Sequence, residues 1–138
     1  MIALTREPID SAAVLAAMSD PQCGAVVLFL GTVRESTGPH RTAFLEYDAY
    51  GPMAEKELRG VAARARERWP VRGVGIVHRL GKLAVGETAV AVAVSAPHRA
   101  EAFEAAAWIM DTVKELVPIW KRENAPDGSA DWMHEGPP

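Results

Sequence analysis

Cysteine is nearly absent from this chain of 138 residues, in which Cys23 stands alone. A single cysteine excludes an intramolecular disulfide and any Cys-x-x-Cys metal or redox site. Cys23 comes just before a strand that reads as buried. A small core residue is therefore the favoured interpretation of this side chain, and a nucleophile is the less favoured one.

Long apolar runs are also missing. The longest, Ala25–Leu30 and Ala89–Val94, are far too short to cross a bilayer. The first residues, MIALTREPID, lack the basic segment followed by an apolar segment that marks a signal peptide. We therefore expect a cytoplasmic protein.

A large excess of one charge is also missing, because 15 Lys and Arg residues stand against 18 Asp and Glu residues, for a formal net charge of −3. A slightly acidic chain is not built as a general nucleic-acid binder. Lysine itself is scarce, with Lys56 and Lys82 in the middle of the chain and Lys114 and Lys121 close together near its C-terminus.

Familiar catalytic signatures are missing as well. The chain has no Gly-x-Ser-x-Gly, no P-loop and no Gly-x-Gly-x-x-Gly. The four histidines lack the spacing of a zinc site, so no metal site is predicted. They are His40, His78, His98 and His134.

The pattern that is present is that of one ordinary domain, with 49% hydrophobic residues to build a core. Apolar residues three and four apart predict helices. These are Ser11–Met18, Met53–Arg68 and His98–Val117. Apolar or alternating runs predict strands. These are Met1–Thr5, Gly24–Arg34, Thr42–Tyr50, Val71–Arg79, Thr88–Ser95 and Ile119–Glu123.

The order of these elements indicates the fold class. Strands come in pairs between helices, which predicts an α+β fold with a mixed or antiparallel sheet and not a doubly wound parallel one. The nearly continuous apolar run Gly24–Arg34 favours a central strand covered on both faces. The domain is expected to span residues 1–124, and residues 125–138, rich in proline and glycine, to form a loosely ordered C-terminal tail.

Cations beside the ends of predicted elements are the first functional signal. Arg34 closes the apolar strand, and His98 and Arg99 open the last helix. Free N–H groups and the positive end of the dipole at a helix start suit an anion such as phosphate or carboxylate. The alternative is that both side chains are merely exposed in the first turn. This feature alone does not favour the anion site over that alternative.

The two close lysines are the second signal. Lys114 falls roughly 60° from the centre of the buried stripe, a border from which an ammonium group can reach into a cleft. Pro118 ends the helix, so a chain that turns back could bring Lys121 to the same pocket. A desolvated lysine near other cations can act as acid, base or nucleophile. The alternative is a pair of solvated surface lysines.

Trp108 is the third signal, because it lies on its helix opposite the buried stripe. An exposed indole can be incidental or can belong to an interface. A subunit contact through Trp108 is our hypothesis.

Several segments, taken together and in this order, resemble one known family. They are GAVVLFLGTVRE, LEYDAYGPMAEKEL, RWPV, IVHRLGKLAVGE, VSAPHRAEAF and MDTVKELVPIWKRE. Along nearly its whole length the chain is similar to the large, catalytic subunit of molybdopterin synthase, the MoaE family. LEYDAYGPMAEKEL and the final K-x-x-x-P-I-W-K-R-E pattern are the most specific parts of the resemblance.

The resemblance implies an α/β-hammerhead-type fold with about three helices and a sulfurtransferase activity. Two sulfurs would pass from the C-terminal thiocarboxylate of a small ubiquitin-like subunit to cyclic pyranopterin monophosphate, called precursor Z. The product would carry the dithiolene of molybdopterin in molybdenum cofactor biosynthesis. This subunit would bind no cofactor of its own, and it would form the homodimer core of a heterotetramer.

The resemblance also implies the site residues. Lys114 and Lys121 would be catalytic, with Lys114 at the partner's C-terminal glycine and Lys121 at the substrate. The substrate-binding residues would be Thr32, Val33, Arg34, His98, Arg99, Lys114, Lys121, Arg122 and Glu123. Phe29 and Met110 would line the pterin pocket, and Thr32 stands where some relatives have a lysine.

Two other functions stay open at this point. One is a non-catalytic binding module for a ubiquitin-like partner, which would not need both lysines. The other is a different phosphate-ligand-binding enzyme, which would depend on Arg34, His98 and Arg99.

Overall fold

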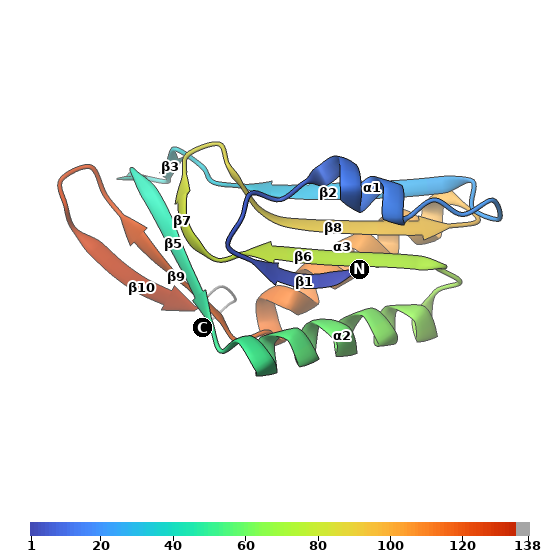
Figure 1. The fold of residues 1–138 in the computed structure, drawn as a ribbon. Helices are drawn as coiled ribbons and strands as arrows, with labels where there is room; N and C mark the ends of the chain where they lie inside the picture. Colours follow the sequence, from blue (N-terminus) through green and yellow to red (C-terminus); the bar gives the residue numbers. More distant parts are fainter. Residues whose placement is uncertain (135–138) are drawn as a thin grey trace.

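A computed structural model describes residues 1–134 of the chain (Figure 1). The helices of this part are α1 (Ser11–Ala17), α2 (Gly51–Arg68) and α3 (Arg99–Leu116). The strands are β1 (Ile2–Thr5), β2 (Ala25–Thr32), β3 (Ser36–Thr37), β4 (His40–Arg41), β5 (Phe44–Ala49), β6 (Gly73–Arg79), β7 (Gly81–Ala84), β8 (Thr88–Ala96), β9 (Ile119–Asn124) and β10 (Ala130–His134). None of the helices in residues 1–134 is long and apolar enough to span a membrane.

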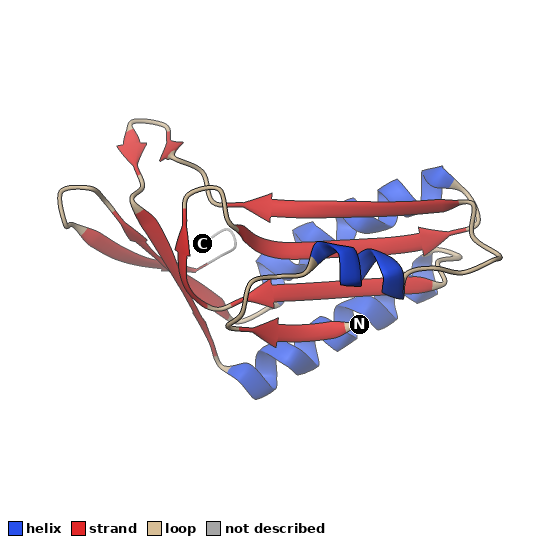
Figure 2. Cartoon of the chain, turned by 45° about the horizontal axis from the view of Figure 1, so that its top comes forward, coloured by secondary structure: helices blue, strands red, loops and turns tan. Residues whose placement is uncertain are grey.

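The main sheet has the strand order β1-β6-β8-β2. Strand β1 runs parallel to β6, and the other neighbours are antiparallel. The long helices α2 and α3 cover one face of this sheet and the short helix α1 lies on the other (Figure 2). This mixed sheet with helices on it confirms the predicted α+β class.

A second sheet, with the order β10-β9-β5-β7, is antiparallel throughout. It stands across one end of the main sheet (Figure 1). Strand β7 lies between β6 and β8 in sequence, so the chain leaves the main sheet for the second sheet and returns at once. The two sheets are therefore fixed to each other by a short connection as well as by packing.

The core forms around β8, in which alanine and valine alternate and every residue after Thr88 is buried. Val92 and Val94 belong to the large cluster that α2 and α3 share. On the other face Ala93 packs with Val14 and Met18 of α1. Because valine and alanine alternate along β8, the valines face α2 and α3 and the alanines between them face the side of α1. The small alanine side chains let α1 lie close to the sheet.

The prediction that Gly24–Arg34 forms a central strand is wrong in one respect. A strand does form there, but β2 is at the edge of the main sheet. Val26 (44% exposed), Phe29 (42%) and Leu30 (37%) keep much of their surface accessible in this single chain. An apolar run indicates that a surface is covered, but it does not indicate whether this chain or another one covers it.

The C-terminal segment also differs from the expected loose tail. After a turn in which the Asp127 carboxylate accepts hydrogen bonds from the backbone N–H and hydroxyl of Ser129 (2.8 and 2.6 Å), β10 pairs with β9. Residues 135–138 lie outside the described residues. The strands β3, β4 and β7 arise in segments expected to be loops and turns, because pairing partners supply hydrogen bonds that local composition does not reveal.

Trp108 packs against another element of its own chain, and a subunit contact through it stays a hypothesis. Its ring lies 5.6 Å from the ring of Trp69, centroid to centroid. The Arg68 guanidinium lies over both rings, at 4.9 and 5.0 Å from their centroids, and the Trp69 indole N–H donates to Glu104 (3.1 Å). This cluster joins the end of α2 to α3.

His78 on β6 is a titratable side chain in the core, with 1% of its surface exposed. Its Nδ1 donates to the carbonyl oxygen of Arg79 (2.8 Å), and its ring meets that of Tyr47 edge-on at 5.0 Å. Burial lowers the pKa of His78 from 6.5 to about 4. The imidazole is therefore neutral in the folded chain at neutral pH.

We expect His78 to make the folded state acid-sensitive. As the pH falls from about 6.5 toward the lowered pKa of about 4, His78 becomes protonated in the unfolded chain but stays neutral in the folded chain. Between about pH 7.5 and pH 5 this removes about 2 kcal/mol of unfolding free energy. In denaturant titrations, His78→Gln should lose this part of the pH dependence, whereas His40→Gln, on the exposed strand β4, should retain it. Equal pH dependence in both variants would contradict the assignment.

Candidate functional site

A cavity of about 410 Å³ opens where the second sheet meets the end of the main sheet. We call it the inter-sheet pocket. Its walls come from β2, β5, β8, β9, the end of α3 and the segment that follows β2. The lining residues are Phe29, Leu30, Gly31, Thr32, Arg34, Thr37, Thr42, Leu45, Tyr47, Ala89, Val90, Met110, Lys114, Lys121 and Glu123.

The inter-sheet pocket holds both lysines that the sequence analysis singled out. Helix α3 ends at Leu116, and Val117 is already extended (φ −83°, ψ 129°), as expected before Pro118. The chain then reverses into β9, so that Lys114 on the last turn of α3 and Lys121 on β9 line the same cavity. The predicted geometry of a helix that stops and turns back is confirmed. The catalytic role of the two side chains stays a prediction.

The residues predicted near the end of β2 divide into two groups. Phe29 and Thr32 line the pocket, as does Arg34 just beyond the strand. Val33 is buried (4% exposed), so its side chain does not line the pocket, and its backbone groups bond to the turn before β8. Its N–H donates to the carbonyl oxygen of Glu87 (3.0 Å), and its own carbonyl oxygen accepts from the N–H of Gly86 (2.8 Å).

The predicted segment Lys121–Glu123 is split by the alternation of β9. Lys121 and Glu123 both face the pocket, where Lys121 Nζ lies 3.7 Å from Glu123 Oε1. Arg122 faces the other side of the sheet, with its guanidinium 3.9 Å from Glu46 Oε1 and 5.9 Å from the centroid of the Trp132 ring. The sheet therefore separates Arg122 from the pocket.

His98 and Arg99 do not join the inter-sheet pocket of their own chain. His98 is the N-cap residue of α3 and Arg99 is its first residue, and both line a shallow depression with Gly24 and Pro97. Lys114 lies fifteen positions after Arg99 on α3, which corresponds to roughly 22 Å along the helix. The prediction of a single anion pocket that contains all these cations is wrong for one isolated chain.

Sequence reasoning missed Tyr47, Leu45 and Thr42 as pocket residues. Tyr47 pairs with Lys121 across β5 and β9, and Leu45 pairs with Glu123. The alternation of LEYDA already puts Leu45 and Tyr47 on one face of their strand. A correct guess of the β5–β9 pairing would have identified both residues.

The charged groups of the pocket favour an anion. Three cationic side chains, Arg34, Lys114 and Lys121, face one carboxylate, Glu123. Arg34 forms no ion pair with any residue in the described part of the chain. Within residues 1–134 no three His, Cys, Asp or Glu side chains gather closely enough to hold a metal ion. The arrangement is suited to binding a phosphorylated or carboxylated ligand.

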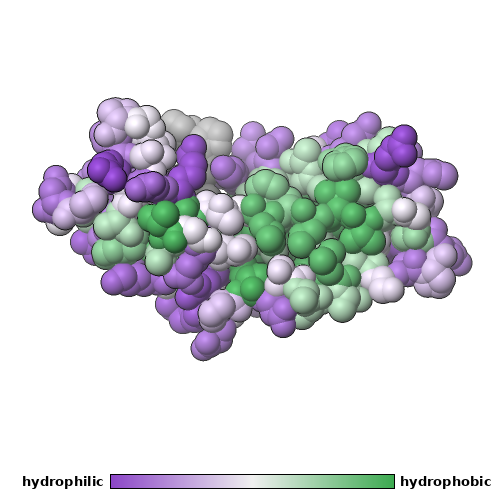
Figure 3. Space-filling view, turned by 90° about the horizontal axis from the view of Figure 1, so that it is seen from above, coloured by the Kyte–Doolittle hydropathy of each residue, from purple (hydrophilic) through white to green (hydrophobic). Residues whose placement is uncertain are grey.

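An apolar groove of about 510 Å³ between β2 and α3 continues from the pocket, sharing Phe29, Met110 and Lys114 with it. The other groove residues are Val27, Leu28, Phe103, Ala106, Ala107 and Asp111. Seen from the side of β2, hydrophobic side chains gather in a broad patch on the surface (Figure 3). A cationic pocket and an apolar face thus meet at one edge of the molecule.

Comparison with known sequences gives consistent results. A sequence model of the family described as MoaE protein matches residues 4–116 of this chain. A molybdopterin synthase catalytic subunit from Halalkalibacterium halodurans is 44% identical over 126 residues, which cover 91% of this chain and 81% of that protein. One from Staphylococcus carnosus is 50% identical over 114 residues, covering 83% and 75%.

Solved structures agree with the sequences. The crystal structure of molybdopterin synthase from Staphylococcus aureus matches with a TM-score of 0.91 and 42% identity, over 96% of both chains. A complex of subunits 1 and 2 of the molybdopterin-converting factor from Helicobacter pylori matches with a TM-score of 0.75 over 96% of this chain and 88% of that chain. Its 19% identity shows a shared fold.

The pocket charges lead to a test with a simple polyanion. We expect pyrophosphate to bind to the unmodified chain and Lys114→Ala or Lys121→Ala to weaken that binding about tenfold, because each removes one charge-assisted contact. Isothermal titration calorimetry at low and high salt measures the effect, and added salt should weaken the binding. Lys56→Ala, an exposed lysine of α2, is the matched control. Equal affinities in all four proteins would contradict the assignment.

Proposed function

Because this chain belongs to the MoaE family of molybdopterin synthase catalytic subunits, we propose that its inter-sheet pocket is the place where sulfur is transferred. The chain acts as the catalytic, sulfur-transferring subunit of molybdopterin synthase in molybdenum cofactor biosynthesis. One observation carries the proposal for the site. Two of the four lysines, from different elements, line one cavity that also contains Arg34.

The proposed substrate is precursor Z, the cyclic pyranopterin monophosphate. Its phosphate would bind to Arg34 and the lysines, which are cations left in excess by the single carboxylate of Glu123. Its ring system would lie against Phe29 and Met110, which form the apolar part of the same wall. Thr32 would contact the substrate from the end of β2.

The proposed sulfur source is a small ubiquitin-like subunit with a C-terminal thiocarboxylate. The Helicobacter pylori protein with the same fold is a complex of two subunits, which supports a partner of this kind. In each transfer the thiocarboxylate sulfur would form a bond to a substrate carbon as a carbon–oxygen bond at that carbon breaks, the oxygen staying on the phosphate as the ring opens in one transfer and leaving as water in the other. Water then cleaves the acyl–sulfur bond. The partner leaves as a carboxylate and the sulfur stays on the substrate. No cofactor bound by this subunit is needed, and we place the reaction in the cytoplasm.

The two lysines have different proposed tasks. Lys114, at the border of α3, would lie at the partner's C-terminal glycine and stabilise negative charge on the acyl group as water attacks. Lys121, which Glu123 holds at 3.7 Å, would bind the substrate and supply a proton as the ring opens. Glu123 keeps the ammonium of Lys121 oriented toward the cavity.

Replacing either lysine tests catalysis against mere binding. Lys114→Ala and Lys121→Ala should lower sulfur transfer by at least about a hundredfold while leaving affinity for the partner nearly unchanged. The assay combines thiocarboxylated partner with precursor and detects the dithiolene product by mass spectrometry. Lys82→Ala, a lysine of β7 outside the pocket, is the control. Full activity in both pocket variants would support a non-catalytic binding module.

We further propose that the working form is a homodimer joined through β2 and α3. Strand β2 is an edge strand, and three of its apolar side chains are exposed in the single chain. A twofold axis across the middle of β2 reverses the direction of the strand in the second copy. The start of β2 in one copy, next to His98 and Arg99, would then lie against the end of β2 in the other.

This arrangement would complete the anion site. Alone, the chain has Arg34, Lys114 and Lys121 at one end of α3 and the His98–Arg99 pair at the other, roughly 22 Å away. In the dimer, His98 and Arg99 of the second copy would reach the inter-sheet pocket of the first. The helix N-terminus that carries them would add its own N–H groups to the phosphate contacts.

Mixing two inactive variants tests the shared site. Arg99→Ala and Lys114→Ala homodimers should each have low activity. After denaturation and refolding together, half of the dimers would be mixed, and each mixed dimer would have one intact site, so about one quarter of full activity should return. If all the residues of a site come from one chain, no activity returns on mixing. Sedimentation measurements on both variants check that dimers still form.

A further inference from the structure

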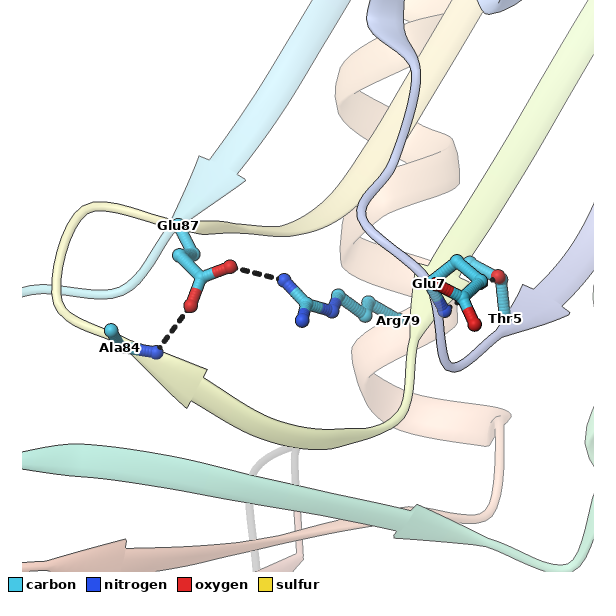
Figure 4. Close-up of polar contacts among 5 residues, drawn as sticks. All are labelled: Thr5, Glu7, Arg79, Ala84 and Glu87. Atoms are coloured by element: carbon cyan, nitrogen blue, oxygen red, sulfur yellow. Dashed lines mark hydrogen bonds and ion pairs between the residues drawn. The ribbon is translucent and has the colours of Figure 1, made fainter.

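Arg79, Glu87 and the N–H of Ala84 form a compact polar cluster beside the end of β2 (Figure 4). One oxygen of the Glu87 carboxylate accepts from Arg79 Nη1, and the other accepts from the backbone N–H of Ala84 (2.8 Å). We call this cluster the Arg79–Glu87 clamp. No residue of the clamp lines the inter-sheet pocket.

The clamp joins the two ends of the segment that crosses between the sheets. Arg79 is the last residue of β6, and Glu87 comes directly before β8. Between them the chain contributes β7 to the second sheet and turns at Gly86, whose φ of +88° suits glycine. The ion pair therefore closes the base of this crossing segment.

The clamp is mostly buried at Arg79 and more exposed at Glu87, whose side chain is 38% exposed. The Arg79 side chain is 12% exposed, and its Nε has no hydrogen-bond partner among the described residues. The N–H of Ala84 and then the guanidinium of Arg79 hold the pKa of the Glu87 carboxyl below its usual range. Loss of this carboxylate would leave Arg79 without its ion-pair partner and the Ala84 N–H without its acceptor, so the turn would lose the two side-chain contacts that hold it.

The backbone of the clamp is bonded directly to the residue before Arg34. Val33 donates to the carbonyl oxygen of Glu87 (3.0 Å) and accepts from the N–H of Gly86 (2.8 Å). Val33 is itself buried, so these two bonds fix the backbone from which Arg34 extends into the pocket. Since Arg34 makes no ion pair with a residue of the described chain, its placement depends on this backbone.

We propose that Glu87 is a positioning residue: held by Arg79, it fixes the turn that sets Val33 and thereby aims Arg34 at the anionic group of the substrate. This inference rests on the proposed function, in which Arg34 contacts the substrate phosphate. It adds to the site a carboxylate that never touches the substrate. The clamp acts on substrate affinity alone, whereas the lysines act on binding and on the chemical step.

The kinetic signature is a change in KM with little change in kcat. Glu87→Ala should raise KM for precursor Z about tenfold, while kcat changes less than about twofold, because only the phosphate contact is weakened. Glu87→Gln retains an acceptor for the Ala84 N–H but loses the charge opposite Arg79, so an intermediate KM is expected. Glu55→Ala, which removes the exposed ion pair with Arg59 on α2, should leave KM unchanged.

A double-mutant cycle separates positioning from general destabilisation. In the Arg34→Ala background, Glu87→Ala should raise KM less than about twofold, because the side chain that it positions is already gone. Equal effects in both backgrounds, or a loss of kcat with unchanged KM, would overturn the proposal. KM does not depend on the amount of folded enzyme, so partial unfolding does not spoil the comparison. If Glu87→Ala does not fold at all, the cycle is run with Glu87→Gln.

The same cycle also tests the premise by itself. If Arg34→Ala alone leaves KM unchanged, Arg34 does not bind the substrate and the proposed site is wrong at that position. If Arg34→Ala raises KM and Glu87→Ala acts independently of it, only the positioning role fails.

Discussion

The site depends on the antiparallel pairing of β5 with β9. Helices α2 and α3 and strands β6, β7 and β8 all lie between these two strands in sequence, so their pairing closes a large loop. The register puts Tyr47 opposite Lys121 and Leu45 opposite Glu123. A slip of one residue would turn Lys121 to the outer face of the sheet and bring Arg122 inside. The chemistry of the pocket is therefore set by strand register as much as by residue type.

Two surfaces of different chemical character meet at the end of α3. One is cationic and enclosed between the sheets, and the other is apolar and open between β2 and α3. Phe29, Met110 and Lys114 belong to both. Because these side chains are shared, an occupant of the apolar groove would change the shape of the pocket and exclude water from it, which strengthens the charge interactions there. The proposed dimer contact and the proposed substrate site would thus use adjoining parts of one wall.

The helices were the most predictable part of the fold, since local signals mark their ends. Asp10 caps α1 by accepting from the N–H of Ala13 (3.1 Å), Pro52 lies in the first turn of α2, and Pro118 follows the end of α3. The strand β7 was missed because its partner β5 lies far away in sequence, and β10 was missed because the proline and glycine of its segment conceal a hairpin with β9. The edge position of β2 was missed because an apolar sequence indicates that a strand is covered but does not indicate whether its own chain or a second chain covers it.

The candidate site was predictable in part. The reversal at Pro118 follows from the sequence, and with it the meeting of Lys114 and Lys121. A strand over Ile119–Glu123 necessarily puts Arg122 on the opposite face from Lys121, so the alternation alone indicates that the three consecutive residues Lys121–Glu123 do not all face one pocket. The separation of His98 and Arg99 from the pocket could not be inferred from a motif. It depends on α3 lying nearly parallel to β2, with the two ends of the helix at the two ends of the strand.

The exposed edge of β2 has a consequence for the life of the chain in the cell. An open strand edge with apolar side chains is a template for unwanted pairing, and proteins usually protect such edges. If a second copy covers this one, each newly made chain is vulnerable until it meets another. The concentration of the chain would then matter directly. Below the concentration at which copies associate, chains would be both inactive and prone to aggregate. Selection on this face would act on solubility and on catalysis at once.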